Sequence, residues 1–241
     1  SQEAIMLAGS FGEALQLLVA GDRELYQITA NSLYFALLST VIIAVIGIPA
    51  GMLLAFRDFP GKRTVVSVFH TLMGLPTVVV GLLVFALLSR SGPLGRYGLL
   101  FTPTAVVIGQ AILAFPIVVS LVYGGLSRLE PELIETLQTF RASRFQQLIK
   151  VVKEGRIAVA SAVLSAFGRV VGEVGVAMML GGNIRWYTRT ITTAMALETA
   201  RGAFALSVAL GIVLMVVAFG VNFGINYLVR FRSTGGWWRR G

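Results

Sequence analysis

Long apolar runs separated by short polar segments constrain this chain more than any other feature. The runs cover about residues 32–56, 64–89, 104–125, 157–181 and 203–229. A helix needs roughly 20 apolar residues to cross the hydrocarbon core of a bilayer, and each run is long enough. The chain is 56% hydrophobic, which is more than a soluble domain of 241 residues needs for its core. The sequence therefore predicts an all-α, polytopic membrane protein with about five transmembrane helices, forming one domain over residues 1–241.

The segment before the first run, residues 1–30, mixes apolar and polar residues. Its apolar residues fit one side of a short helix lying in the membrane interface. Asn31 stands where an N-cap of the first span is expected. Gly74, Pro76 and Pro116 interrupt later runs. In membranes such interruptions are tolerated where neighbouring helices or cavity water satisfy the freed backbone groups, so these three are candidate residues of a translocation path.

The 20 Lys and Arg residues are distributed unevenly along the chain. Thirteen lie in the 57–63 turn, the 127–156 segment and the C-terminal tail, whereas six lie in the remaining loops and the N-terminal segment. Because basic loops face the cytosol, we expect the N-terminus outside and the C-terminus in the cytosol. The net charge of +9 does not indicate a nucleic acid partner, since the basic residues flank apolar runs instead of sharing a face.

Few side chains here suit catalysis or metal binding. The chain has no cysteine, one histidine and 11 Asp and Glu residues, which excludes thiol chemistry and Cys-based metal sites. No nucleophile–base pair of an intramembrane enzyme is evident. We expect no catalytic residue, metal or cofactor in this chain. The lone His70 is expected at the membrane interface, and the threonines of the 188–193 stretch are expected as helix caps and partner contacts.

Arg169 and Glu173 stand four residues apart in the fourth run, hence on one face of a helix. A charge at the bilayer centre costs about 2.5–3.5 kcal/mol on insertion scales, so the two should pair or line a wet cavity. Two interpretations stay open: an internal ion pair that holds helices together, and a charged element beside a translocation path. Glycines 168, 172 and 175 suit close helix contact in lipid.

The longest polar interval, residues 127–156, predicts two short helices separated by a tight corner. Capping-box spacing occurs at residues 127–130 and again at residues 143–146. An apolar stripe at helical spacing follows the first cap: Leu129, Leu133, Leu137 and Phe140. By the distribution of basic residues this interval faces the cytosol.

The run Glu135-Thr136-Leu137, followed after three residues by Arg141-Ala142-Ser143, resembles the EAA loop of ABC importer permeases, written E-A-A-x-x-x-G-A-S. In that family the loop is a coupling helix that docks in a groove of the cytosolic ATPase. The resemblance implies the following ATPase contacts: Leu133, Glu135, Thr136, Leu137, Phe140, Arg141, Ala142 and Ser143. Arg141 replaces the motif glycine and Glu154 replaces an expected proline. The corner is therefore expected to differ, because glycine adopts a left-handed backbone more easily than arginine.

The fourth run and the loop after it carry a second resemblance. The run Ala166–Gly175 and the following Gly182-Asn183 resemble oxyanion importers for molybdate, tungstate and sulfate. Residues Gly181–Ala194, followed by Ala196–Thr199, resemble tungstate ABC transporter permeases in particular. With Asn31-Ser32-Leu33 and Gly74-Leu75-Pro76, this likeness covers nearly the whole chain.

The resemblance implies the fold of type I ABC importer permeases (MetI-like) and a homodimer in the cell membrane of a prokaryote. The oxyanion path would run between the two copies. Two cytosolic ATPase subunits would bind ATP and Mg²⁺, and an external tungstate-binding protein would dock on the outer loops. Its candidate contacts are Asn183, Thr188, Arg189 and Thr192.

Two alternatives remain beside a tungstate permease. One is a permease for molybdate or another oxyanion. The other is a secondary anion transporter that uses Arg169 and Glu173 as an ion-coupled relay. The amphipathic 127–156 segment favours an ABC permease, because a secondary transporter needs no docking site for an ATPase.

Overall fold

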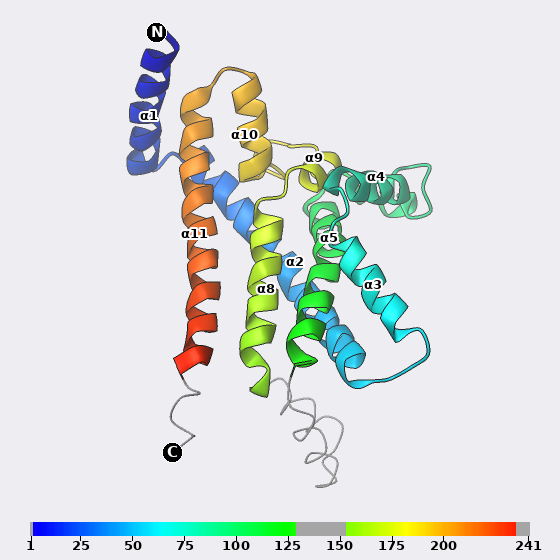
Figure 1. The fold of residues 1–241 in the computed structure, drawn as a ribbon. Helices are drawn as coiled ribbons and strands as arrows, with labels where there is room; N and C mark the ends of the chain where they lie inside the picture. The colour runs from blue at the N-terminus through cyan, green and yellow to red at the C-terminus, as the bar shows by residue number, and fades with distance from the viewer. Residues whose placement is uncertain (1, 129–152, 235–241) are drawn as a thin grey trace.

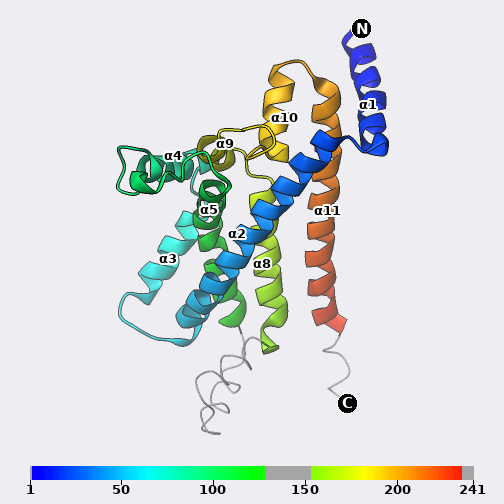
Figure 2. The same ribbon diagram turned by 180° about the vertical axis from the view of Figure 1, so that it is seen from behind.

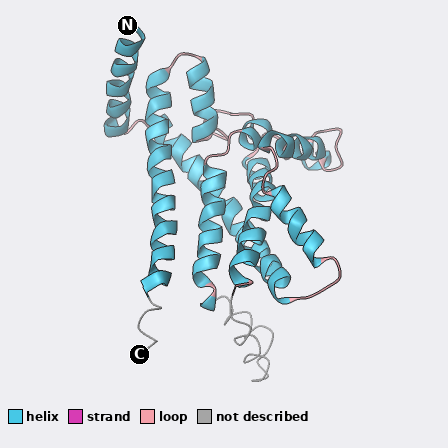
Figure 3. Cartoon of the chain, viewed as in Figure 1, coloured by secondary structure: helices cyan, strands magenta, loops and turns pink. Residues whose placement is uncertain are grey.

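The computed structural model describes residues 2–128 and 153–234, and every regular element in these ranges is a helix (Figure 3). The elements are α1 Gln2–Ala20, α2 Arg23–Phe56, α3 Lys62–Leu72, α4 Thr77–Leu88, the 3-10 helix η1 Gly95–Tyr97, α5 Pro103–Leu126, α8 Arg156–Val171, α9 Gly175–Gly181, α10 Ile191–Ala200 and α11 Phe204–Thr234. The all-α prediction is confirmed.

Three helices, α2, α5 and α11, are each long and apolar enough to cross a membrane alone. Two further spans arise if each bent pair counts as one: α3 with α4, bent by 100°, and α8 with α9, bent by 60°. Helices α2, α5, α8 and α11 lie side by side, while α4 and α9 lie across the upper part of the bundle (Figures 1 and 2). Three of the five predicted runs therefore form single helices long enough to span, and the other two form bent pairs that reach this length only when each pair is counted together.

Helix α2 begins at Arg23, well before the predicted start of the first span. Asp22 is its N-cap, with Oδ1 accepting a hydrogen bond of 2.9 Å from the Leu25 N–H. The prediction that Asn31 caps this span is wrong, because Asn31 lies inside the helix. The helix extends because Leu25 and Ile28 are buried in an apolar cluster with residues of α10 and α11.

The helix breakers behave differently from one another. The interruption predicted at Gly74 and Pro76 is confirmed: α3 ends at Leu72, and Pro76 is the N-cap of α4. The interruption predicted at Pro116 is wrong, since α5 runs through it. Pro116 is buried within α5. It is therefore part of a continuous, packed helix and does not form a turn.

The centre of the bundle is an apolar cluster shared by α2, α5 and α8. Helices α2 and α5 approach closely because two glycines of α2 face valines of α5. A Cβ on Gly51 would lie 2.8 Å from Cβ of Val122, and one on Gly47 would lie 3.0 Å from Val118. Small residues permit this kind of helix contact in lipid, where close packing drives association.

Two elements near the N-terminal end of the bundle complete the fold. The helix predicted within residues 1–30 is α1, which packs against α11 with Ala14 buried and Phe11, Leu15 and Val19 exposed on one side. The predicted loop 182–202 contains a ten-residue helix, α10, between its threonine caps and α11. It forms a hairpin with α11 (Figure 1).

Candidate functional site

The fourth predicted span breaks between α8 and α9, and the break gathers polar groups inside the bundle. Helix α8 ends at Val171, Gly172 is its C-cap, and α9 starts at Gly175. A broken helix frees backbone N–H and C=O groups that hydrocarbon cannot satisfy. Side chains must therefore supply the missing partners, and they come from the break itself and from two other helices, α5 and α10.

Glu173 lies in the break and satisfies the start of α9. Its side chain is 3% exposed, and Oε1 accepts a hydrogen bond of 3.2 Å from the N–H of Val176. Its backbone carbonyl accepts a hydrogen bond of 2.6 Å from the hydroxyl of Thr192 on α10. A carboxylate at the N-terminal end of a helix also complements the partial positive charge there. Glu173 therefore joins α9 to α10 as well as carrying a charge.

The carboxylate of Glu173 forms an ion pair with Arg169, as the sequence analysis expected. Arg169 Nη1 lies 2.6 Å from Glu173 Oε2, and the Arg169 side chain is 37% exposed. The two residues do not lie on one face of a single helix, as their spacing predicted, because Glu173 lies beyond the end of α8. Its N–H bonds instead to the carbonyl of Val170 at 3.2 Å. The buried carboxylate and partly open guanidinium suit both roles considered for this pair.

A buried polar relay on the other side of the break links three helices. Gln110 of α5 donates from Nε2 to the carbonyl of Val170 at 3.4 Å. The hydroxyl of Ser39 on α2 donates to Gln110 Oε1 at 3.2 Å. Both side chains are buried. The sequence analysis missed these residues, although an amide in the middle of the 104–125 run was a detectable signal.

The two broken spans meet at their short helices. A Cβ on Gly175, the first residue of α9, would lie 3.0 Å from the hydroxyl of Thr77, the first residue of α4. A Cβ on Gly81 would lie 2.9 Å from the sulfur of Met179. The structure thus brings the turn with Gly74 and Pro76, which are both exposed, near the Glu173 break.

The loop between α9 and α10 is a compact turn held by its own side chains. Gly182, Asn183 and Trp186 have positive φ angles of 67°, 50° and 66°. The Thr188 hydroxyl donates to the carbonyl of Gly181 at 2.5 Å and accepts from the N–H of Ile184 at 3.0 Å. Left-handed backbone is uncommon for residues other than glycine, so these contacts hold the loop in one shape.

A second Arg–Glu assembly, here called the outer ion cluster, joins this loop to α2 and α10. Its members are Glu24, Arg185, Arg189, Glu198 and Arg201. Glu24 accepts two hydrogen bonds from Arg185, at 2.9 and 2.6 Å, and one from Arg189 at 3.2 Å. The hydrogen bond and charge of Glu24 raise the pKa of the Arg185 guanidinium. In the described ranges, no three His, Asp or Glu side chains gather as a metal site requires.

The sequence that forms these helices matches a known protein family. Residues 47–233 match the model of the binding-protein-dependent transport system inner membrane component. The chain belongs to this family. It is therefore a multi-pass membrane permease subunit of an ABC importer, and its long apolar helices are consistent with this family.

Three relatives match most of this permease. A probable anion ABC transporter permease protein of Haloferax volcanii is 40% identical over 77% of this chain and 82% of its own length. The tungstate uptake system permease protein TupB of Campylobacter jejuni is 41% identical over 83% of both chains. TupB of Peptoclostridium acidaminophilum is 38% identical over 84% of this chain and 89% of its own.

Solved structures of importers share the fold of this permease. A chain of the bacterial alginate ABC transporter, in complex with an alginate-bound periplasmic protein, superposes with a TM-score of 0.73. The match covers 95% of this chain and 88% of the other at 18% identity. A chain of the MetNI methionine ABC transporter in an inward-facing conformation superposes with a TM-score of 0.63, also at 18% identity, over 89% and 97% of the two chains. The type I importer fold expected from the sequence is confirmed.

Three of the four residues expected to contact a binding protein are buried in this permease. The hydroxyls of Thr188 and Thr192 donate to backbone carbonyls within the chain, as described above. Arg189 belongs to the outer ion cluster. Asn183 is half-buried and donates to the carbonyl of Thr193 at 3.2 Å. The exposed side chains of the same loop are Ile184, Arg185, Trp186 and Tyr187. Their exposure makes them better placed for a partner than the four residues first selected.

The expected role of threonines as helix caps is confirmed at α10, where Thr190 and Thr193 form a capping box. The expected ATPase contacts lie outside the described residues: Leu133, Glu135, Thr136, Leu137, Phe140, Arg141, Ala142 and Ser143. The flanking helices are described, and α5 ends and α8 begins at the same end of the bundle, beside the end of α2 (Figure 1).

Proposed function

We propose that this chain is the permease subunit of an ATP-driven tungstate importer and forms the oxyanion path as a homodimer. The observation that carries the proposal is the likeness to two TupB proteins, at 38% and 41% identity over more than four fifths of every chain compared. Molybdate is the second candidate. It has the same charge and nearly the same size, so selectivity between the two anions would reside in the external binding protein.

The proposed partners follow from the same likeness. Two cytosolic ATPase subunits would hold ATP and Mg²⁺ and carry out hydrolysis, while this chain converts their closure into alternating access. A binding protein would deliver the anion on the outer face, near the loop between α9 and α10. This placement puts the N-terminus outside and the C-terminus in the cytosol, in agreement with the distribution of Lys and Arg.

The proposed ATPase contact is the segment containing Leu133, Leu137 and Phe140. Its apolar stripe would enter the ATPase groove, while Glu135 and Arg141 would meet charged groups at the rim. A fully buried aromatic residue at an interface contributes roughly 2 kcal/mol or more when truncated, which exceeds tenfold in affinity. A secondary transporter has no use for such a contact, so this segment discriminates between the two classes.

The test is Phe140→Ala in the purified complex of permease, ATPase and binding protein. We expect the ATPase to dissociate more than tenfold more readily and ATP-driven tungstate uptake into proteoliposomes to fall with it. Phe59→Ala, in the turn between α2 and α3, is a matched control for loss of an exposed aromatic side chain on the same side. Unchanged ATPase retention and uptake in Phe140→Ala would remove the coupling role.

A further inference from the structure

Helix α3 has a polar face that nothing in the described part of the chain covers. Arg63, Ser67 and Thr71 follow one another at four-residue spacing, so they share one side of the helix, and Thr64 lies beside them. All four side chains are exposed, and α3 contains no buried residue. We call these four residues the α3 polar face.

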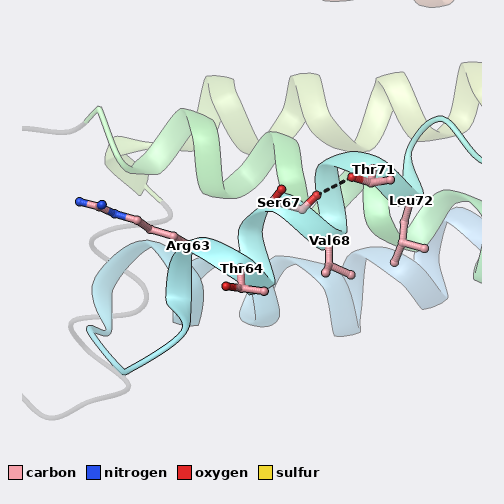
Figure 4. A pocket seen from close by; sticks show the side chains of 6 residues that line it. All are labelled: Arg63, Thr64, Ser67, Val68, Thr71 and Leu72. Carbon is pink, nitrogen blue, oxygen red and sulfur yellow. Dashed lines mark hydrogen bonds between the residues drawn. The ribbon is translucent and has the colours of Figure 1, made fainter.

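An open pocket of about 450 Å³ lies over this face. Figure 4 shows its lining, which consists of the four polar side chains together with Val68 and Leu72. The Thr71 hydroxyl donates to the carbonyl of Ser67 at 2.9 Å. The hydroxyls of Thr64 and Ser67 have no hydrogen-bond partner among the described residues. The pocket therefore offers free hydroxyl donors and one guanidinium.

The opposite side of α3 is apolar and packs on a spanning helix. Val65, Val66 and Phe69 are half-buried, and the rings of Phe69 and Phe115 of α5 make an edge contact at 6.0 Å. Helix α3 lies beside α5 in both views of the fold (Figures 1 and 2). An amphipathic helix held against a span in this way does not lie flat in the membrane interface.

The exposed faces of neighbouring spans are different. On α2 between residues 32 and 56, and on α4, every exposed side chain is apolar or aromatic, Val45 and Leu82 among them. Such faces suit lipid, whereas a charged side chain and unpaired hydroxyls do not. The difference within one chain indicates that the α3 polar face meets water rather than hydrocarbon.

We propose that the α3 polar face lines the water-filled path and coordinates the passing oxyanion through the free hydroxyls of Thr64 and Ser67 and the guanidinium of Arg63, with Thr71 lining the same path. An oxyanion has acceptors only, and this face presents donors. The nearest carboxylate along the chain, Asp58, is paired with Lys62 at 3.0 Å. Neutral hydroxyls bind an anion weakly enough for release, as conduction requires. The inference rests on the proposed function for the identity of the anion.

The absence of cysteine from the chain gives a direct test. Ser67→Cys and Thr71→Cys would be compared with the lipid-face controls Val45→Cys and Leu82→Cys, in the complete complex in lipid nanodiscs. A water-soluble thiosulfonate should label the two α3 cysteines about tenfold or more faster, because a thiol in apolar surroundings stays protonated and unreactive. Tungstate should slow this labelling, whereas chloride at equal ionic strength should not.

Three results would overturn the inference. If the two α3 cysteines are labelled as slowly as the two lipid-face controls, the α3 polar face lies in lipid. Disulfides between two copies at Ser67→Cys, with no labelling, would make it a contact between copies. Slower labelling that depends on the anionic lipid content, and not on tungstate, would assign the α3 polar face to lipid headgroups.

The labelling and uptake assays also distinguish this inference from the proposed function. If ATP-driven uptake fails while the labelling pattern is as expected, the proposed function is wrong, but the conclusion that the α3 polar face meets water still stands. Normal uptake with unlabelled α3 cysteines rejects only the aqueous face.

Discussion

The α8–α9 break and the outer ion cluster both pair arginine with glutamate, but they do so in opposite surroundings. At the break, one buried carboxylate serves the Val176 N–H and the Arg169 guanidinium together. In the outer ion cluster, two carboxylates are shared among three guanidinium groups, of which Arg185 and Arg201 are largely exposed. Removing Arg169 therefore leaves a buried carboxylate without its charged partner, whereas the exposed guanidinium groups of the outer ion cluster can rearrange and hydrate.

The largest effect is expected at Glu173. Glu173→Ala removes the acceptor of the Val176 N–H and leaves Arg169 without its partner, which should destabilise the fold by about 3 kcal/mol. Glu173→Gln keeps an oxygen for the N–H and should be milder. Thermal unfolding of the purified permease in detergent measures both.

A pair of variants separates the charge from the packing at this break. Arg169→Met alone should be less stable than Arg169→Met combined with Glu173→Gln, since only the single variant leaves a buried charge. Equal stability of the two would mean that the ion pair has no structural role. A loss of uptake with unchanged stability and assembly would instead favour a charged element beside the path.

The next effect is expected at Gln110. Gln110→Leu removes the amide hydrogen bonds with the Val170 carbonyl and the Ser39 hydroxyl. The Val170 carbonyl still accepts from the Glu173 N–H and the Ser39 hydroxyl still donates to the Ala36 carbonyl, so the expected loss is that of ordinary hydrogen bonds, about 0.5–1.5 kcal/mol each. Ser120→Ala is the matched control on the same helix, because the buried Ser120 hydroxyl has no hydrogen-bond partner among the described residues. If both variants unfold at the same temperature, the relay does not hold the break.

The smallest effect is expected in the outer ion cluster. Glu24→Gln should lower the unfolding temperature only slightly at low salt, and the difference should vanish near 1 M salt, where the Debye length is about 3 Å. The Glu173 variants should show no such dependence on salt. A Glu24→Gln defect as large as that of Glu173→Ala would erase the contrast between the two regions.

The spans and the α3–α4 break were predictable because hydropathy and a Gly-x-Pro turn act locally. The α8–α9 break was not, since residues 157–181 have the composition of a span whether straight or broken. Partners distant in sequence, Gln110 and Thr192, make the break possible.

Two of the three glycines expected at helix contacts lie at such contacts. A Cβ on Gly168 would lie 3.3 Å from Val221 of α11, and a Cβ on Gly175 would lie 3.0 Å from Thr77 of α4. Gly172 is instead the C-cap of α8.

The binding-protein contacts were selected as polar residues of a loop that the resemblance places outside, and polarity does not reveal exposure. Arg189 and Thr192 look suitable for a partner, yet both are buried. Arg189 pairs with Glu24 of α2 and Glu198 of α10, and Thr192 donates to the carbonyl of Glu173. The prediction that Asn31 is the N-cap of the first span was wrong for a related reason. Its amide donates to the carbonyls of Tyr187 and Arg189, a contact across more than 150 residues that no local pattern contains.

The most direct measurement is tungstate uptake into proteoliposomes holding the permease, its ATPase and its binding protein. Uptake should require both ATP on the ATPase side and binding protein on the opposite side, and a proton or sodium gradient should not replace ATP. Exchanging the binding protein for one that selects molybdate should change the anion carried. Uptake driven by an ion gradient without ATP would contradict the account and identify this chain as a secondary transporter.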